Sequence, residues 1–161
     1  MKVVVLSDTH TMGASRPLPK GAWPYIETAD HILHGGDVCD PALLDELQLF
    51  APVTVVMGNC DGADIAHWGA PGETVVELGG ARVAMLHDSG ARAGRRSRMR
   101  ERFPAARVVV FGHSHIPWNE DEDGLLLLNP GSPTWKRTSP YESMAILWID
   151  GADVEAEVFP V

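Results

Sequence analysis

Five apolar segments of the chain each lead directly into side chains that could bind a metal ion. The groups that follow these segments are Asp8-Thr9-His10, Gly35-Gly36-Asp37, Gly58-Asn59-Cys60-Asp61, His87 and Gly112-His113-Ser114-His115. Residues two apart on an extended segment point the same way, so Asp8 and His10 can aim paired side chains at one region. Ligands in parallel α/β sheets gather beyond the carboxyl ends of the strands, so five such ends can converge on one crevice.

Seven side chains form the candidate ligand set. They are Asp8, His10, Asp37, Asn59, His87, His113 and His115. Their carboxylate, imidazole and amide oxygen donors, with no convincing thiolate, suit Mn, Fe, Zn, Ni or Co more than a closed structural zinc site. Seven ligands exceed what one ion needs, so we expect two divalent ions that share a bridging carboxylate. Gly36, Gly58 and Gly112 stand where the backbone must turn sharply or approach closely, which a Cβ would hinder.

Short apolar runs bounded by Gly, Asp, Asn or His predict the strands that position these residues. The runs are 3–6, 53–57, 75–78, 82–86, 107–111, 125–128 and 144–149. The runs at 3–6 and 53–57 are continuous and β-branched, which is typical of strands buried on both faces. We therefore expect helices to cover at least one face of the sheet.

The clearest predicted helix runs from Pro41 to Phe50, with a proline in its first turn and an apolar stripe that includes Leu43, Leu44 and Leu47. The proline-rich segment from Thr11 to Pro24 should be a loop before a short helix at 25–29. We interpret the acidic run at 120–123 as a solvated turn between two strands.

A second helix is predicted at about 91–103. It holds Arg92, Arg95, Arg96, Arg98, Arg100 and Arg102, which are six of the thirteen basic residues. Met99 and Phe103, one turn apart, should be its buried edge. A solvated amphipathic face is the simpler interpretation of the arginines, although one or two guanidinium groups after His87 could reach a phosphate. Arg137 is a comparable candidate.

The composition predicts one compact domain over residues 1–161. A hydrophobic content of 45% in 161 residues is enough for one substantial core. The formal charge of −9 argues against a stable nucleic-acid complex, because phosphate backbones are bound through clustered Lys and Arg. Two divalent cations would add about +4, so an anionic substrate stays compatible with this charge.

The cysteines and the N-terminal sequence predict a cytoplasmic protein. Cys39 and Cys60 show no framework spacing, so neither a disulfide scaffold nor a thiolate zinc site is indicated. The apolar run that follows Met1 and Lys2 is too short for a secretory signal or a membrane span, so we expect no membrane association. The sequence leaves open whether the chain forms a homo-oligomer.

Taken together, the motifs resemble those of the calcineurin-like metallophosphoesterases, and among them the small YfcE-type phosphodiesterases of bacteria and archaea. The matching blocks are Asp8-Thr9-His10, Gly36-Asp37, Gly58-Asn59-Cys60-Asp61, His87, Gly112-His113-Ser114-His115 and Asn129-Pro130-Gly131-Ser132. They span almost the whole chain in the family's order. The resemblance implies an α/β fold, a four-layer α-β-β-α sandwich of two mixed β-sheets flanked by helices.

The resemblance also implies how the ligands are shared between two ions. One ion would be bound by Asp8, His10, Asp37 and His115, and the other by Asp37, Asn59, His87 and His113. Asp37 would then be the bridge. The expected cofactors are two divalent metal ions, with Mn as our first expectation and Ni, Co, Zn, Fe or Mg as alternatives.

The implied reaction is hydrolysis of a small phosphoester, preferably a diester, through in-line attack by a hydroxide that bridges the two ions. Asn59 and His113 would help to stabilise the charge that builds on the phosphoryl oxygens. Asp61 resembles the family's carboxylate that orients a neighbouring group without binding metal. We therefore take Asn59, His113 and Asp61 as the catalytic residues.

Two positions depart from the family pattern. Many relatives carry a histidine directly after the motif asparagine, thought to protonate the leaving group, but Cys60 stands here. Small relatives often continue the fourth block as His-Gly-His, whereas this chain has His87-Asp88-Ser89-Gly90. The identity of the general acid and the substrate contacts at the fourth block are therefore open.

Two other classes of protein compete with the enzyme. A scaffold that keeps this fold without turnover, as in one retromer subunit, is disfavoured because no ligand of the set is missing. A nucleotide-binding α/β module is disfavoured because neither Gly-x-Gly-x-x-Gly nor Gly-x-x-x-x-Gly-Lys occurs near the first strand.

Overall fold

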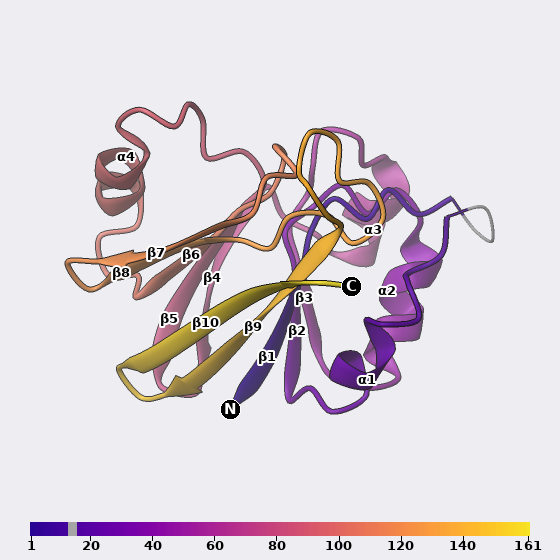
Figure 1. The fold of residues 1–161 in the computed structure, drawn as a ribbon, viewed down its shortest axis with the longest axis horizontal. Coiled ribbons are helices and arrows are strands. Elements are labelled where there is room, and N and C mark those ends of the chain that lie inside the picture. Colours follow the sequence, from indigo (N-terminus) through magenta and orange to yellow (C-terminus); the bar gives the residue numbers. More distant parts are fainter. Residues whose placement is uncertain (13–15) are drawn as a thin grey trace.

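The computed structural model describes residues 1–12 and 16–161, which form two β-sheets with helices on their outer faces (Figure 1). The first sheet has the strand order β10-β9-β1-β2-β3, and the second has the order β4-β5-β6-β8-β7. The strands are β1 (Lys2–Leu6), β2 (His31–His34), β3 (Val53–Val55), β4 (Glu73–Leu78), β5 (Ala81–Leu86), β6 (Val108–Val110), β7 (Trp118–Glu122), β8 (Leu125–Asn129), β9 (Ser143–Asp150) and β10 (Asp153–Pro160). The helices are α1 (Trp23–Ile26), α2 (Pro41–Gln48), α3 (Ala63–Trp68) and α4 (Arg95–Arg102).

The side chains of β1 show why two apolar layers are needed. Val3 and Val5 pack into the core between the two sheets, whereas Val4 and Leu6 pack into a second core beneath α1, α2 and α3. All four are fully buried, as expected for a strand covered on both faces. The helix α4 covers the other sheet through Met99, so the order of layers is α-β-β-α, as predicted.

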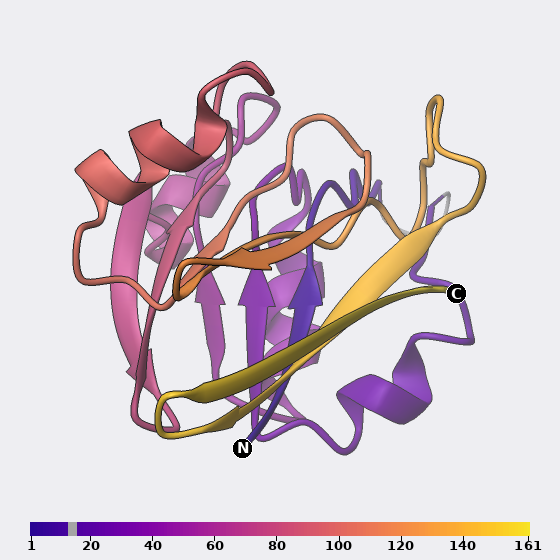
Figure 2. The ribbon, with the colours of Figure 1, turned by 60° about the vertical axis from the view of Figure 1, so that its left-hand side comes forward.

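The parallel strands of both sheets determine where the candidate site forms. The strands β1, β2 and β3 run parallel in the first sheet, and β5, β6 and β8 run parallel in the second. In Figure 2 the arrowheads of the three parallel strands of the first sheet point the same way, toward a group of loops at one end of the sandwich. The five ligand groups all belong to such strand ends.

All seven predicted strands are confirmed, and three elements that pair with them were not predicted. These are β2, β7 and β10. The interpretation of 120–123 as a turn is wrong, because most of this run belongs to β7, which pairs with β8, and only Asp123 and Gly124 turn. As an edge strand, β7 tolerates charged side chains that face water.

The predicted helices at 41–50 and 91–103 are confirmed within shorter bounds, as α2 and α4. The Asp40 side chain caps α2 by accepting a hydrogen bond from the Ala42 N–H at 3.0 Å. The short helix expected at 25–29 begins earlier, at Trp23, and α3 was not predicted. Part of the loop expected from Thr11 to Pro24 lies outside the described residues. None of the helices in the described ranges is long and apolar enough to cross a bilayer.

Candidate metal centre

Three side chains from the ends of β1 and β6 form the first group of donor atoms. Asp8 and His115 are fully buried and His10 is almost so. The Nε2 atoms of His10 and His115 lie 3.2 Å apart, and their rings stack at 5.1 Å. His115 Nε2 also lies 3.3 Å from Asp8 Oδ1. The structure thus brings a carboxylate and two imidazoles to one point, as the sequence predicted.

The second group of donor atoms comes from the ends of β2, β3, β5 and β6. His87 Nε2 lies 3.4 Å from Asp37 Oδ2 and 3.2 Å from Asn59 Oδ1. The Asn59 oxygen also lies 2.8 Å from His113 Nδ1. The structure therefore places the remaining four predicted ligands side by side.

Asp37 and Asp8 connect the two groups. Asp37 Oδ2 lies 3.6 Å from His10 Nε2 and 3.4 Å from His87 Nε2, so it reaches one imidazole of each group. Asp8 Oδ1 is 3.9 Å from His87 Nε2. Ligand atoms at about 2.0–2.2 Å from one ion stand about 3–3.6 Å from each other. The donor distances therefore fit divalent cations.

The imidazoles are oriented for metal binding by hydrogen bonds at their far nitrogens. His87 Nδ1 donates to the carbonyl of Gly35 at 2.7 Å, and His115 Nδ1 donates to the carbonyl of Trp135 at 2.5 Å. Each of these bonds leaves the Nε2 lone pair directed at the donor group. We conclude that both rings are held in the tautomer that a metal ion requires.

Opposing effects set the charges of Asp37 and His87. Burial, the largest single effect, raises the pKa of Asp37, but its bonds to His87 and to the Cys60 backbone together hold that pKa well below its usual range. Burial lowers the pKa of His87, but its bond to Asp37 and the nearby carboxylates together raise that pKa above its ordinary value. Without a cation, the carboxylates thus favour the charged form of the imidazole, and the imidazole favours the charged form of Asp37.

Asp61 supports the centre from behind Asp37. Its Oδ2 accepts hydrogen bonds from the backbone N–H groups of Asp37, at 2.9 Å, and Gly58, at 2.7 Å, while Oδ1 accepts from Cys39 N–H at 2.8 Å. One carboxylate thus fixes the backbone of two ligand loops. This geometry agrees with an orienting role and places Asp61 outside the two donor groups.

The glycines of the ligand loops stand where other chain segments come close. A Cβ at Gly58 would overlap Asp37, and a Cβ at Gly112 would overlap Ser7 and Asp8. At Gly36 it would meet His87 Nδ1 at 2.8 Å, and φ there is +95°. The predicted need for close approach is confirmed at all three positions.

Five of the candidate ligands adopt a left-handed backbone that the sequence did not reveal. The φ angles are 54° at Asp8, 43° at His10, 56° at Asp37, 67° at His113 and 59° at His115. Such conformations are uncommon for residues with a Cβ and gather at functional sites, where the surrounding structure maintains them. They turn each ligand sharply out of its strand end.

Polar residues outside the two donor groups hold these turns. The hydroxyl of Ser7 donates to Asp8 Oδ2 at 2.7 Å. Asn129, the last residue of β8, donates to the carbonyl of Gly112 at 2.9 Å, and Ser132, three residues later, donates to the carbonyl of Asp8 at 2.7 Å. The segment from Asn129 to Ser132 therefore supports the centre.

His34 lies fully buried behind the ligand loops and not among the ligands. Its Nδ1 accepts from the Gly36 N–H at 3.2 Å, so its Nε2 carries the proton and donates to Thr9 Oγ1 at 3.0 Å. Burial lowers the pKa of His34 to about 3. It is therefore a neutral core histidine with a hydrogen-bond partner at each ring nitrogen, and it braces Thr9, between Asp8 and His10.

Two hollows flank the donor groups on different sides. One, of about 280 Å³, is lined by Asn59, His87 and His113 together with Asp88 and Arg102. The other, of about 610 Å³, is bordered by His10 and lined further by Cys39, Arg16 and Trp135. A ligand at the centre can therefore extend in two directions.

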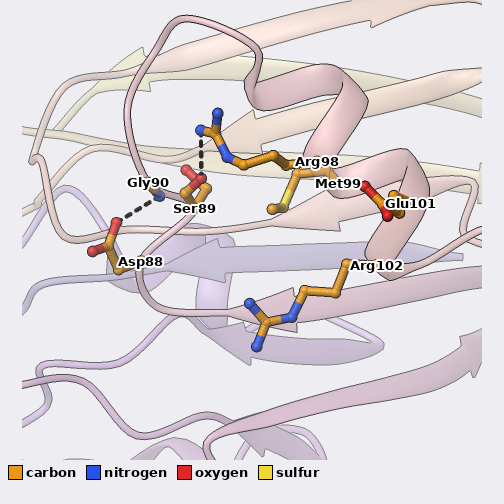
Figure 3. A pocket seen from close by; sticks show the side chains of 7 residues that line it. All are labelled: Asp88, Ser89, Gly90, Arg98, Met99, Glu101 and Arg102. Atoms are coloured by element: carbon orange, nitrogen blue, oxygen red, sulfur yellow. Dashed lines mark hydrogen bonds between the residues drawn. The ribbon is translucent and has the colours of Figure 1, made fainter.

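A third hollow, of about 450 Å³, continues from the first and shares Asp88 and Arg102 with it (Figure 3). Arg98 donates across this hollow to the carbonyl of Ser89 at 3.1 Å. Arg102 forms an ion pair with Glu73 at 2.5 Å. These arginines therefore have protein partners at the edge of the site.

Two arginines of α4 contact the second sheet, in addition to forming part of the solvated face that the sequence favoured. Arg96 pairs with Glu120 at 2.7 Å and donates to the carbonyl of Leu125 at 2.7 Å. The guanidinium of Arg95 lies 4.8 Å from the ring centre of Phe111. Arg95 and Arg96 thus attach the helix to the second sheet, a role that only the tertiary structure reveals.

Cys60 lies at the rim of the centre and is exposed. Its backbone N–H donates to Asp37 Oδ1 at 2.8 Å, and its sulfur accepts from Asn59 Nδ2 at 3.3 Å. With His10 and Asp37 it forms a further group of closely spaced donor atoms. Burial and then the Asp37 charge raise the pKa of its thiol, so in the metal-free protein the sulfur stays protonated at neutral pH.

The chain belongs to the calcineurin-like phosphoesterase superfamily, whose domain matches residues 1–152. A probable metallophosphoesterase from Methanothermobacter thermautotrophicus is 34% identical over 98% of this chain and 91% of its own length. Divalent metal ions are therefore the expected cofactors of this fold.

Solved structures agree with this assignment. A predicted phosphoesterase from Streptococcus pneumoniae is 26% identical, with a TM-score of 0.74 over 99% of this chain and 88% of its own. Vps29 of Entamoeba histolytica in complex with zinc is 22% identical, with a TM-score of 0.79 over 99% of this chain and 98% of its own. The second likeness shows the fold alone.

Proposed function

We propose that the protein is a dinuclear metal-dependent phosphodiesterase. The observation that carries this proposal is the position of Asp37, whose Oδ2 lies within 3.6 Å of an imidazole of each donor group. One ion would be held by Asp8, His10, Asp37 and His115, and the other by Asp37, Asn59, His87 and His113. Mn is our first choice for both, followed by Ni, Co, Zn, Fe and Mg.

When bound, two adjacent divalent ions lower the pKa of water toward neutrality and attract the phosphoryl oxygens. The residues of the chain supply the rest of the chemistry. Asn59 and His113, 2.8 Å apart and open to the smaller hollow, stand where charge would build on the phosphoryl group. Asp61 keeps Asp37 in place through the backbone. Hydrolysis would proceed by in-line attack of hydroxide on phosphorus.

The two hollows support a diester as the substrate. A diester phosphorus carries two organic groups, and a hollow of about 280 Å³ and another of about 610 Å³ lie on different sides of the donor atoms. Each could accept one group. A monoester would need only one of them. We expect a small phosphodiester, no stable nucleic-acid complex and a cytoplasmic location.

A non-catalytic scaffold is the second candidate, because the fold matches Vps29 with a TM-score of 0.79. That relative was solved in complex with zinc, so metal binding alone does not distinguish the two functions. Turnover does. A scaffold would bind metal and hydrolyse no phosphoester.

The test is hydrolysis of bis(p-nitrophenyl) phosphate by protein reconstituted with Mn, Ni or Co. We expect turnover that a chelator abolishes and added metal restores. Cyclic nucleotides, dinucleotides and phospholipid-derived diesters, screened with the same metals, would identify the substrate class. Protein that holds close to its full metal content yet hydrolyses none of these esters would support the scaffold.

A further inference from the structure

We propose that Arg137 binds the non-bridging phosphoryl oxygens of the substrate and so supplies positive charge at the side of the centre where His113 stands. The proposal rests on the proposed function, because it assumes that a phosphoryl group sits on the donor atoms. Arg137 belongs to the loop between β8 and β9, far along the chain from most of the ligands.

The guanidinium of Arg137 is placed beside the ligand loops. Its Nη1 donates to the carbonyl of His113 at 3.2 Å. Arg137 therefore lies against the loop that carries His113 and His115.

The loop that carries Arg137 is attached to the centre on both sides. His115 Nδ1 donates to the carbonyl of Trp135 at 2.5 Å, while Arg137 donates in the other direction to His113. The guanidinium also lies 4.8 Å from the ring centre of Trp135, and that ring contacts His10 edge-on at 5.3 Å. The backbone at Arg137 is left-handed, with a φ of 49°, which is uncommon for a residue with a Cβ.

Arg137 has N–H donors that remain available, whereas Arg98 and Arg102 donate theirs to protein acceptors. A guanidinium has five N–H donors in a planar fork that matches phosphate. Within the described ranges, His113 is the one hydrogen-bond acceptor found for Arg137. Arg102, at the other hollow, pairs with Glu73, and Arg98 donates to the carbonyls of the 89–93 segment. The free edge of Arg137 is thus available to a phosphoryl group.

The experiment measures binding of inorganic phosphate to the metal-loaded protein by calorimetry, beside KM and kcat for bis(p-nitrophenyl) phosphate. The variants are Arg137→Ala and Arg137→Lys. The matched control is Lys136→Ala, which removes a neighbouring charge whose Nζ donates to the carbonyl of Pro140 within the same loop. Metal content and melting temperature are determined for each protein.

We expect Arg137→Ala to weaken phosphate binding by about tenfold to a hundredfold and to raise KM similarly, because charge-assisted hydrogen bonds are lost. Arg137→Lys should recover part of this loss, since Lys keeps the charge without the fork. Lys136→Ala should behave as wild type, and metal content should stay the same in all variants.

Unchanged phosphate affinity in Arg137→Ala, or an equal loss in Lys136→Ala, would overturn the inference while leaving wild-type turnover intact. The proposed function fails separately, if wild-type protein binds phosphate through Arg137 but hydrolyses no ester. A loss of affinity that accompanies loss of metal would show that Arg137 only supports the loop, which also overturns the inference.

Discussion

Asp61 accepts a hydrogen bond from the backbone N–H of Asp37 at 2.9 Å, and this contact holds the backbone of the residue that carries the central carboxylate. Its other oxygen accepts from Cys39 N–H. An asparagine would present an NH₂ group to one of these N–H donors, and two donors repel. We therefore expect Asp61→Asn to weaken metal binding by about tenfold to a hundredfold, as measured by competition with a chromogenic chelator.

The control for Asp61→Asn is Asp64→Asn, at the start of α3, whose carboxylate bonds to its neighbour Ile65. This change should leave metal affinity unaltered. If Asp61→Asn bound metal as tightly as wild type, an orienting role for Asp61 would be excluded.

Replacing Asp37 should affect both donor groups, whereas replacing His113 should affect one. Asp37 Oδ2 reaches His10 in one group and His87 in the other, whereas the side chain of His113 lies against Asn59 and His87, both of the second group. Elemental analysis should find that Asp37→Ala retains almost no metal and that His113→Ala retains the ion of the first group. Equal metal loss in the two variants would contradict the bridging position of Asp37.

Cys60 should act as a spacer and not as the general acid. General acids contribute about 10²–10⁴-fold, most with poor leaving groups such as alkoxides and little with acidic aryl alcohols. The enzyme should therefore prefer aryl to alkyl esters, and Cys60→Ser should change aryl diester turnover little. Cys60→His should raise the alkyl rate if the imidazole reaches the leaving oxygen. A large loss of aryl turnover in Cys60→Ser, with metal content intact, would assign the thiol a catalytic task.

His34 should make the stability of the metal-free protein depend on pH. Burial lowers its pKa to about 3, while the unfolded chain keeps a value of about 6.5. Between these values the unfolded state binds more protons, so the free energy of unfolding decreases as pH falls, by up to about 1.4 kcal/mol per pH unit. His34→Asn keeps an acceptor for Gly36 but does not titrate, so its stability should fall less steeply.

Urea unfolding of both proteins from pH 6.5 to pH 4, with chelator present, measures this difference in slope. His67→Asn is the control, because His67 lies exposed on α3. Its slope should match that of the wild type. Parallel pH profiles for wild type and His34→Asn would mean that the pKa of His34 is not lowered in the folded state.

The sequence predicted most of the strands because buried parallel strands are continuous apolar runs that stand out against polar loops. It missed β2 because only Ile32 and Leu33 are apolar between two histidines, and β7 because an edge strand tolerates acidic residues. It missed β10 because charged residues that face water interrupt its apolar positions. Pairing with a neighbouring strand, and not local composition, defines these elements.

The ligand groups could be predicted because each follows its own strand, and parallel strands bring their carboxyl ends together. The supporting contacts could not. Ser7 and His34 carry no spacing signal of their own, and their hydrogen bonds to Asp8 and Thr9 become identifiable only when the chain is folded. The left-handed backbone at the ligands also leaves no sequence signal, because the residues there are not glycine.

Asp8 follows the first strand of one sheet and His115 follows a strand of the other, yet their donor atoms lie 3.3 Å apart. A cation held by both is therefore a cross-link between the two halves of the sandwich, formed only after the sheets have docked. Its binding free energy adds to the stability of the docked state, by an amount that grows with the logarithm of the ratio of ion concentration to dissociation constant. We therefore expect a destabilising substitution in the core between the sheets to weaken metal binding before any secondary structure is lost.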